Sequence, residues 1–290
     1  NTNNHYIDLQ KIACLKATLC SIDLHKYLDN YQSRSGITLS LHIGMSAGYV
    51  TSMHAGGILD RWEYLQFGPP LDDIGVAVSS ATAGETIVSP YMWNIIKDLD
   101  NQHGYLFDND LCGKNLIQQL KYTKDQSCIV TDKHLRAIQQ YIPFAIHTKL
   151  AHGRHRDLCK TIEVSCVFLK VATGIEVNHN PIIAHKILQT FQKCIYKLQG
   201  SLNKFLVDDK GTIAMAIFGI DGYRNDNPSR ALDASINTIK SLANIGIKSQ
   251  CGVTTGKVFA GIVGNSNRKE FTVIGDSINT ASRLMMNANP

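Results

Sequence analysis

The stretch VFAGIVGNSNRKEFTVIGDSINTASRLM, residues 258–285, decides the fold of the C-terminal half of the chain. Its apolar pattern predicts a strand at 269–274, preceded by another strand at 247–257. Behind Gly275, apolar side chains recur at helical spacing over 277–287. This stretch and the residues just before it therefore predict two strands followed at once by a helix.

Working upstream, the same kind of pattern predicts further elements. They are a strand at 162–171, a helix at 181–199, a hairpin with arms at 202–208 and 212–219, and a helix at 228–244. The residues between the arms, DDKG, suit a tight turn. The order βαββαβ followed by a helix predicts an α+β fold of the ferredoxin-like type, with the helices on one face of the sheet.

The chain also contains an internal repeat. LHIGMSAGYV (41–50) matches SQCGVTTGKV (249–258) at an offset of 208, and EYLQFGPPLD (63–72) matches EFTVIGDSIN (270–279) at an offset of 207. The matching glycine pairs are Gly44 and Gly252, Gly48 and Gly256, Gly56 and Gly264, and Gly68 and Gly275. Two copies of one domain explain this self-similarity.

The repeat sets the expected domain boundaries. Residues 1–100 are the C-terminal part of the first copy, 101–160 are a polar linker with a helix at 132–141, and 161–290 are the second copy, truncated at its C-terminus. The offset places the start of the first copy before Asn1. We therefore expect two domains in tandem, both incomplete in this chain.

Composition excludes several classes of protein. The net charge of +5 comes without a long basic run, so a nucleic-acid partner is not expected. No apolar run reaches the roughly 20 residues that a membrane span needs. The 8 cysteines form no CxxC pair and several lie in apolar stretches, which indicates reduced thiols and a cytoplasmic protein.

Two stretches resemble class III adenylyl and guanylyl cyclases. Residues 258–285 are similar to the core motif of this family, and NKFLVDDKGTIAMAIFG (203–219) is similar to its central hairpin. RWEYLQFGPPLDDIGVA (61–77) resembles the core motif in altered form. Within the family the likeness is to the soluble, bicarbonate-responsive adenylyl cyclases, which carry two unequal cyclase domains on one chain.

The resemblance implies a reaction and an arrangement. Two cyclase domains pack head to tail around one active site, where the 3′-hydroxyl of the nucleotide attacks its own α-phosphate and pyrophosphate leaves. Two Mg²⁺ or Mn²⁺ ions activate the hydroxyl and neutralise the phosphates. The implied function is an adenylyl cyclase, which makes cyclic AMP from ATP in intracellular signalling.

The resemblance places Lys204 and Thr272 where the family reads the base. An ammonium group donates to N1 of adenine, and a threonine oxygen accepts from its 6-amino group. Guanine reverses both groups, so Lys204 disfavours a guanylyl cyclase. Taken singly, the two residues also fit a solvated lysine and an ordinary strand threonine.

Asn279 and Arg283 lie four and eight residues after Gly275 and share one face of the predicted helix. The resemblance implies that Asn279 orients the ribose and that Arg283 stabilises charge on the α-phosphate in the transition state. The alternative is a pair of ordinary surface residues.

The metal ligands depart from the family pattern. The family's metal strand reads roughly V-x-F-x-D, whereas VSCVFLKVA places Lys170 at the position of the aspartate, and a lysine cannot bind Mg²⁺. Asp208 or Asp209 could stand in for the second ligand, but a turn role explains them better. The ligands of both ions are therefore expected upstream of Asn1, so the fragment alone should be inactive.

The first copy cannot form a second catalytic site. Asp72, Val76 and Leu65 stand opposite Asn279, Arg283 and Thr272. Gly75 replaces the arginine with which the soluble enzymes bind bicarbonate, which argues against a bicarbonate response. The alternative to an enzyme is a catalytically inactive, cyclase-like module that binds nucleotide and regulates an attached domain.

Overall fold

The structure is a computed structural model of the 290-residue chain. It describes residues 2–103, 130–153, 158–171, 180–208, 211–222, 224–265 and 269–289. The chain divides into two compact units: unit 1 comprises Asn1–Thr51 and Gly68–Ile129, and unit 2 comprises Ser52–Phe67 and Val130–Pro290. None of the helices in the described ranges is long and apolar enough to cross a membrane.

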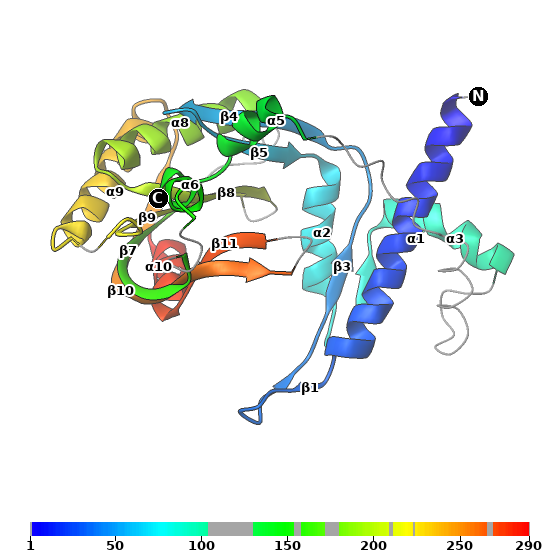
Figure 1. The fold of residues 1–290 in the computed structure, drawn as a ribbon. Coiled ribbons are helices and arrows are strands. Elements are labelled where there is room, and N and C mark those ends of the chain that lie inside the picture. Colours follow the sequence, from blue (N-terminus) through cyan, green and yellow to red (C-terminus); the bar gives the residue numbers. More distant parts are fainter. Residues whose placement is uncertain are drawn as a thin grey trace. The chain divides into compact units, whose positions relative to one another are not determined.

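Unit 2 is built on a five-stranded antiparallel sheet in the order β11-β10-β7-β9-β8 (Figure 1). The strands are β7 (Lys160–Val171), β8 (Ser201–Asp208), β9 (Gly211–Phe218), β10 (Ser249–Gly264) and β11 (Lys269–Ile274). Helix α8 (Pro181–Lys197) follows β7, α9 (Asn227–Ala243) follows β9, and α10 (Asp276–Asn287) follows β11. This succession confirms the predicted βαββαβ order with its additional helix.

The helices of unit 2 cover both faces of the sheet. On one face, Val167 and Leu169 of β7 pack with α8 and α9 in one core cluster. On the other face, Cys166 packs with Ile278 and Ala281 of α10. The prediction that the helices lie on one face is therefore wrong for α10. The reason is visible in β7, whose nearly continuous apolar run presents apolar side chains to both faces, and each face requires a cover.

A hairpin from the first copy of the repeat belongs to unit 2. Strands β4 (Thr51–Ile58) and β5 (Arg61–Phe67) pair, and their turn residues Leu59 and Asp60 both have positive φ, at 53° and 56°. Positive φ at both central residues is the geometry of a type I′ turn. Ala55, Leu65 and Phe67 are buried in the same core cluster as α8.

Polar contacts fix this hairpin on α8. The side-chain amide of Gln192 donates to the carbonyl of Arg61 at 2.8 Å, and that of Gln189 donates to the carbonyl of Gly56 at 2.9 Å. The backbone N–H of Gly56 donates to Nδ1 of His185 at 3.2 Å. Side chains of α8 thus satisfy backbone groups of the hairpin, an association that the sequence did not predict.

Two short helices of unit 2 lie in the region predicted as a linker. Helix α5 (Asp132–Gln139) agrees with the helix predicted at 132–141 and begins with a capping box between Thr131 and His134. In α6 (Phe144–Ala151), Ile146 joins the core cluster on the α10 side of the sheet. This part of the region is therefore packed onto the domain.

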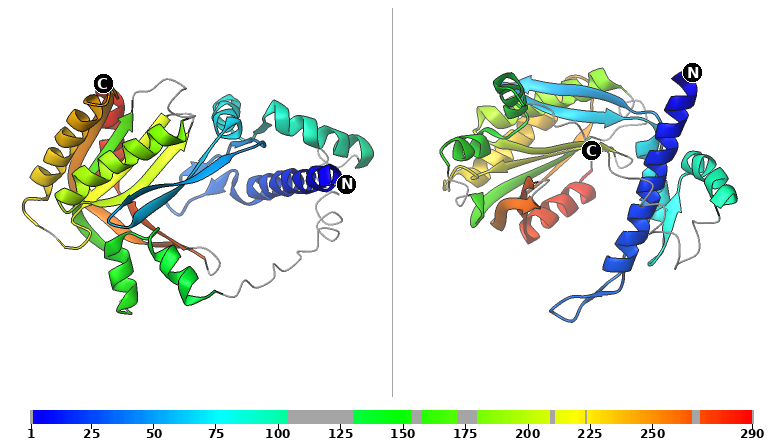
Figure 2. Two further views of the ribbon diagram at one scale, coloured as in Figure 1. Left: turned by 90° about the horizontal axis from the view of Figure 1, so that it is seen from above. Right: turned by 45° about the vertical axis from the view of Figure 1, so that its right-hand side comes forward.

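Unit 1 consists of α1 (Thr2–Leu28), β1 (Tyr31–Gln32), β2 (Thr38–Leu39), β3 (Ile43–Met45), α2 (Pro69–Ser80), β6 (Thr86–Val88) and α3 (Pro90–His103). Helices α1 and α3 lie side by side (Figure 2). Strand β3 pairs in parallel with β6, and Met45 packs with Cys14, Met92 and Ile96.

Glycines of the repeat have matching surroundings in the two units. A Cβ on Gly44 would lie 2.5 Å from the backbone nitrogen of Val78 in α2, and a Cβ on Gly252 would lie 2.5 Å from that of Met285 in α10. In the same way, a Cβ on Gly48 would meet Pro70, and one on Gly256 would meet Ser277. In both units, therefore, the helix after the hairpin approaches the preceding strand at glycine.

Candidate active site

The predicted base-reading residue Lys204 lies on β8 next to a β-bulge. Leu202 pairs with Ala216 and Lys204 with Met215, so Asn203 is the additional residue on this strand. A bulge of this kind bends an edge strand and redirects its side chains, and bulges are common beside active sites. Asn203 and Lys204 consequently both line one cavity of about 1190 Å³, which we call the Lys204 cavity.

Lys204 is held by a carboxylate from the opposite edge of the sheet. Its Nζ lies 3.3 Å from Oε1 of Glu270 on β11. Both side chains are partly exposed, at 42% and 54%, so the pair contributes at most about 1 kcal/mol to stability. Its main consequence is positional, because it holds the ammonium group at the Lys204 cavity.

The contact between opposite edges follows from the length of β10. This strand pairs with β7 from Ser249 to Ala260 and with β11 from Phe259 to Gly264. The β10–β11 arm therefore extends past the end of β7 (Figure 1), and Glu270 of this arm contacts Lys204 of β8. A single flat sheet would keep the two edges four strands apart.

Thr272 lies on the same side of β11 as Glu270, because side chains two residues apart in a strand point to the same side. It is partly buried and pairs with Gly261 of β10. The structure therefore brings the strand that carries Thr272 to Lys204, with Glu270 as the residue in direct contact. Glu270 was missed in the sequence, although its position two residues before Thr272 was a usable signal.

Asn279 and Arg283 are both exposed on α10, which begins directly after Gly275 at the end of β11. Their spacing of four residues places them on one side of the helix, as predicted. Neither belongs to the residues that line the Lys204 cavity in the described part of unit 2. The structure thus places the four predicted site residues at three positions. Lys204 lines the cavity, Thr272 lies on β11 two residues after the one that contacts Lys204, and Asn279 and Arg283 lie on α10, the helix after β11.

A buried ion pair forms another part of the wall of the Lys204 cavity. Nη2 of Arg61 lies 2.6 Å from Oε1 of Glu63, with the side chains only 10% and 18% exposed. Burial raises the pKa of Glu63 to about 7, although the charge of Arg61 acts in the opposite direction. Sequence reasoning missed both residues; their spacing of two on a strand was the available signal.

The residues present do not fit a pair of magnesium ions. At the position expected for an aspartate, Nζ of Lys170 lies 3.6 Å from Sδ of Met286. No group of three or more His, Cys, Asp or Glu side chains that could hold a metal ion occurs among the described residues. The side chain of Asp208 and the whole of Asp209 lie outside them.

Comparison with known proteins relates the chain to cyclases. Residues 159–290 match the family model described as the adenylate and guanylate cyclase catalytic domain. Adenylate cyclase type 10 of Oryctolagus cuniculus is 25% identical over 307 residues, which cover 92% of this chain and 18% of the rabbit protein. Soluble guanylate cyclase 89Db of Drosophila melanogaster is 24% identical over 229 residues, covering 68% of this chain and 34% of that protein.

Among solved structures, a bacterial light-regulated adenylyl cyclase is 16% identical, with a TM-score of 0.46 over 71% of this chain and 57% of that one.

The five-stranded sheet and Lys204 thus lie within the part of the chain, residues 159–290, that is similar to the catalytic domain of adenylate and guanylate cyclases. Adenylate cyclase type 10 is similar to the chain over 92% of its length, while the chain spans only 18% of the rabbit protein.

Proposed function

We propose that this chain provides the base-binding and phosphate-binding half of an adenylyl cyclase, which converts ATP to 3′,5′-cyclic AMP and pyrophosphate. The observation that carries this proposal is the ammonium group of Lys204, held by Glu270 at the Lys204 cavity. Such a donor suits N1 of adenine, whereas guanine carries an N–H at that position.

Acceptors for the 6-amino group of adenine are close to Lys204. The side-chain oxygen of Asn203 is buried and has no hydrogen-bond partner among the described residues. The carboxylate of Glu270 and the hydroxyl of Thr272 supply further acceptors on β11. A donor flanked by acceptors is the pattern that adenine requires.

The proposed roles of Asn279 and Arg283 follow from their exposure and from their place on the helix directly after β11. Asn279 and Arg283 are exposed, so they are accessible to the ribose and the phosphates of a nucleotide whose base lies beside β11. We assign Asn279 to the ribose and Arg283 to the charge that develops on the α-phosphate.

We further propose that residues 1–100 and 161–290 belong to two cyclase copies in tandem that pair head to tail. The matching glycine contacts of α2 and α10 support the two copies. The β4–β5 hairpin supports the pairing, because its Ala55 and Phe67 are only 0% and 3% exposed in the core cluster with α8. The equivalent residues of the β10–β11 arm, Val263 and Ile274, are 47% and 55% exposed. A helix like α8 from the other copy is the cover that this arm lacks.

We propose that the metal-binding aspartates come from that other copy. Lys170 replaces the first of them in this copy, and a lysine cannot bind Mg²⁺ or Mn²⁺. The 290-residue chain alone is then inactive, and the two ions bind only in the paired site. We also propose a cytoplasmic location and, from Gly75, no response to bicarbonate.

The experiment measures cyclic AMP and cyclic GMP formed by the full-length gene product from ATP or GTP with Mg²⁺ or Mn²⁺. The expected product is cyclic AMP from ATP, strongly reduced by Lys204→Ala and unchanged by Lys193→Ala, which removes an exposed lysine of α8. Full activity in Lys204→Ala would refute the proposed role.

A second candidate is a catalytically inactive module that binds nucleotide, which the lysine at position 170 favours. It predicts that ATP binds to the full-length product with a dependence on Lys204, while neither cyclic nucleotide is formed. Formation of cyclic AMP excludes it.

A further inference from the structure

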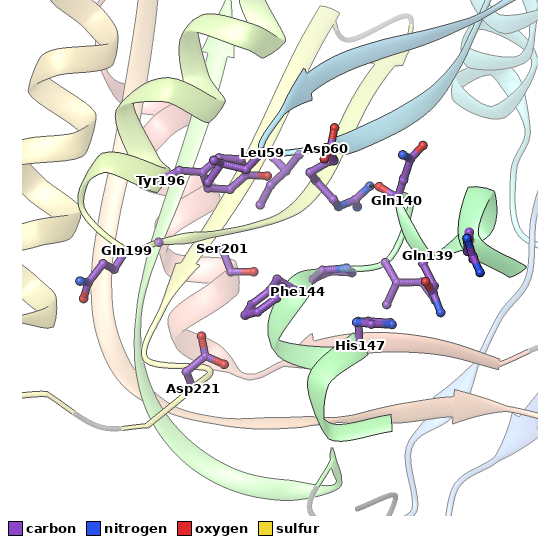
Figure 3. Close-up of a pocket in the computed structure, with 16 residues that line it drawn as sticks. Leu59, Asp60, Gln139, Gln140, Phe144, His147, Tyr196, Gln199, Ser201 and Asp221 are labelled. Atoms are coloured by element: carbon purple, nitrogen blue, oxygen red, sulfur yellow. Dashed lines mark hydrogen bonds between the residues drawn. The ribbon is translucent and has the colours of Figure 1, made fainter. Parts of the chain in front are cut away.

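A second cavity of about 650 Å³ lies in unit 2, at the junction of three segments (Figure 3). They are the turn between β4 and β5, the α5–α6 region, and the junction of α8 with β8. We call it the junction cavity. Its size falls in the usual range of small-molecule sites.

Two large apolar side chains are exposed at this cavity. Leu59 and Phe144 are each 80% exposed, and both line it. Figure 3 shows Phe144 in the middle of the cavity, with Gln199 and Asp221 on one side and His147 and Gln139 on the other. Leu59 also has a φ of 53°, a conformation that is unfavourable for leucine. Exposed apolar groups gathered around one cavity favour a ligand with a flat apolar body.

The polar side of the cavity favours an anion. Arg61 lines it and is only 10% exposed, and its guanidinium binds Glu63 and the carbonyls of Trp62 and Gln140 through the two terminal nitrogens. The remaining donor, Nε, is buried and has no partner among the residues that the structure describes. A buried donor without an acceptor is costly, and a ligand oxygen would remove that cost.

Two further side chains of the cavity, on its α5–α6 side, can also donate hydrogen bonds to an anion. Arg136 is exposed on α5 and His147 is partly buried on α6, so both add donors on the α5–α6 side. Asp60 and Asp221 also line the cavity, but both are exposed and remain hydrated. Glu63 already pairs with the terminal nitrogens of Arg61, so the buried polar group of this cavity that still lacks a partner among the described residues is a donor, Nε of Arg61.

We propose that the junction cavity binds a small aromatic carboxylate, with its ring on Phe144 and Leu59 and its carboxylate on the Arg61–Arg136 side. This site is separate from the Lys204 cavity, although Arg61, Ile142 and Pro143 line both. A ligand in the junction cavity would thus lie directly behind the wall of the proposed base site.

The test is isothermal titration calorimetry of the full 290-residue chain with 2-naphthoate, and with the neutral 2-naphthalenemethanol for comparison. We expect saturable binding of the carboxylate and at least about tenfold weaker binding of the alcohol. Phe144→Ala should raise the Kd for 2-naphthoate by about tenfold or more, and Arg136→Ala should raise it several-fold. Both residues are exposed, so the variants should keep the circular dichroism spectrum of the wild type.

Matched controls are Phe259→Ala and Arg34→Ala, which remove exposed side chains that do not line this cavity. Their affinities should equal that of the wild type. Absence of saturable 2-naphthoate binding, or equal affinity in the Phe144→Ala variant, overturns the site. Equal binding of the alcohol overturns the assignment of an anionic ligand.

Discussion

The attachment of the β4–β5 hairpin to α8 leads to a sharp prediction about stability. Phe67 is 3% exposed in the core cluster with α8, whereas Ile274, its counterpart in the repeat, is 55% exposed. Truncating a buried phenylalanine leaves a cavity and costs about 3–5 kcal/mol. Truncating a half-exposed isoleucine costs roughly 0.5 kcal/mol or less. Phe67→Ala should therefore destabilise unit 2 far more than Ile274→Ala.

The assay is urea unfolding followed by tryptophan fluorescence. The chain has 2 tryptophans, so a Trp93→Phe background leaves Trp62 of β5 as the only reporter. With typical domain stabilities of about 5–15 kcal/mol, a loss of 3–5 kcal/mol shifts the midpoint clearly. Equal midpoints for Phe67→Ala and Ile274→Ala would show that the hairpin is not part of this core.

Three further predictions concern charged groups at the Lys204 cavity and on α10. The pKa of Glu63 is raised to about 7 in the folded state, so the unfolded state loses its proton first as pH rises. The free energy of unfolding of unit 2 should therefore fall by on the order of 1–3 kcal/mol between about pH 4.5 and pH 7. Urea midpoints across that range should show this fall, and Glu63→Gln should abolish it. Glu270→Ala should leave the urea midpoint unchanged but raise KM for ATP about fivefold in the full-length product, because Lys204 loses the carboxylate that positions it; an unaltered KM contradicts this role. Arg283→Ala should lower kcat about 10²-fold to 10³-fold with little change in KM, and a change confined to KM would assign Arg283 to ground-state binding instead.

Much of unit 2 could be predicted from the sequence, because its apolar periodicity and its turns are local signals. The strand predicted at 269–274 has those bounds in the structure, and the helix predicted at 228–244 is α9, Asn227–Ala243. The position of α10 was not predictable in the same way. A strand that is apolar on both faces requires two covers, but its sequence does not say which helix provides each.

The contacts between distant segments were the other part that the sequence could not supply. The position of Glu270 two residues before Thr272 could suggest a role for it, but nothing in the sequence indicates its contact with Lys204, because that contact depends on the path of the β10–β11 arm. Likewise, the backbone of Arg61 is bound by Gln192, 131 residues away. The motif predicted which residues carry the proposed chemistry, whereas the packing of the arm and the hairpin decides which groups hold them.

The central claim is that Lys204 selects adenine. Its most direct test is the ratio of kcat/KM for ATP to that for GTP, measured on the full-length product and on its Lys204→Glu variant. Because one mispaired hydrogen bond costs about 1–3 kcal/mol, we predict a preference for ATP of at least about tenfold in the wild type, and its loss or reversal in Lys204→Glu. A wild-type preference for GTP, or an ATP preference that survives in Lys204→Glu, would contradict the account.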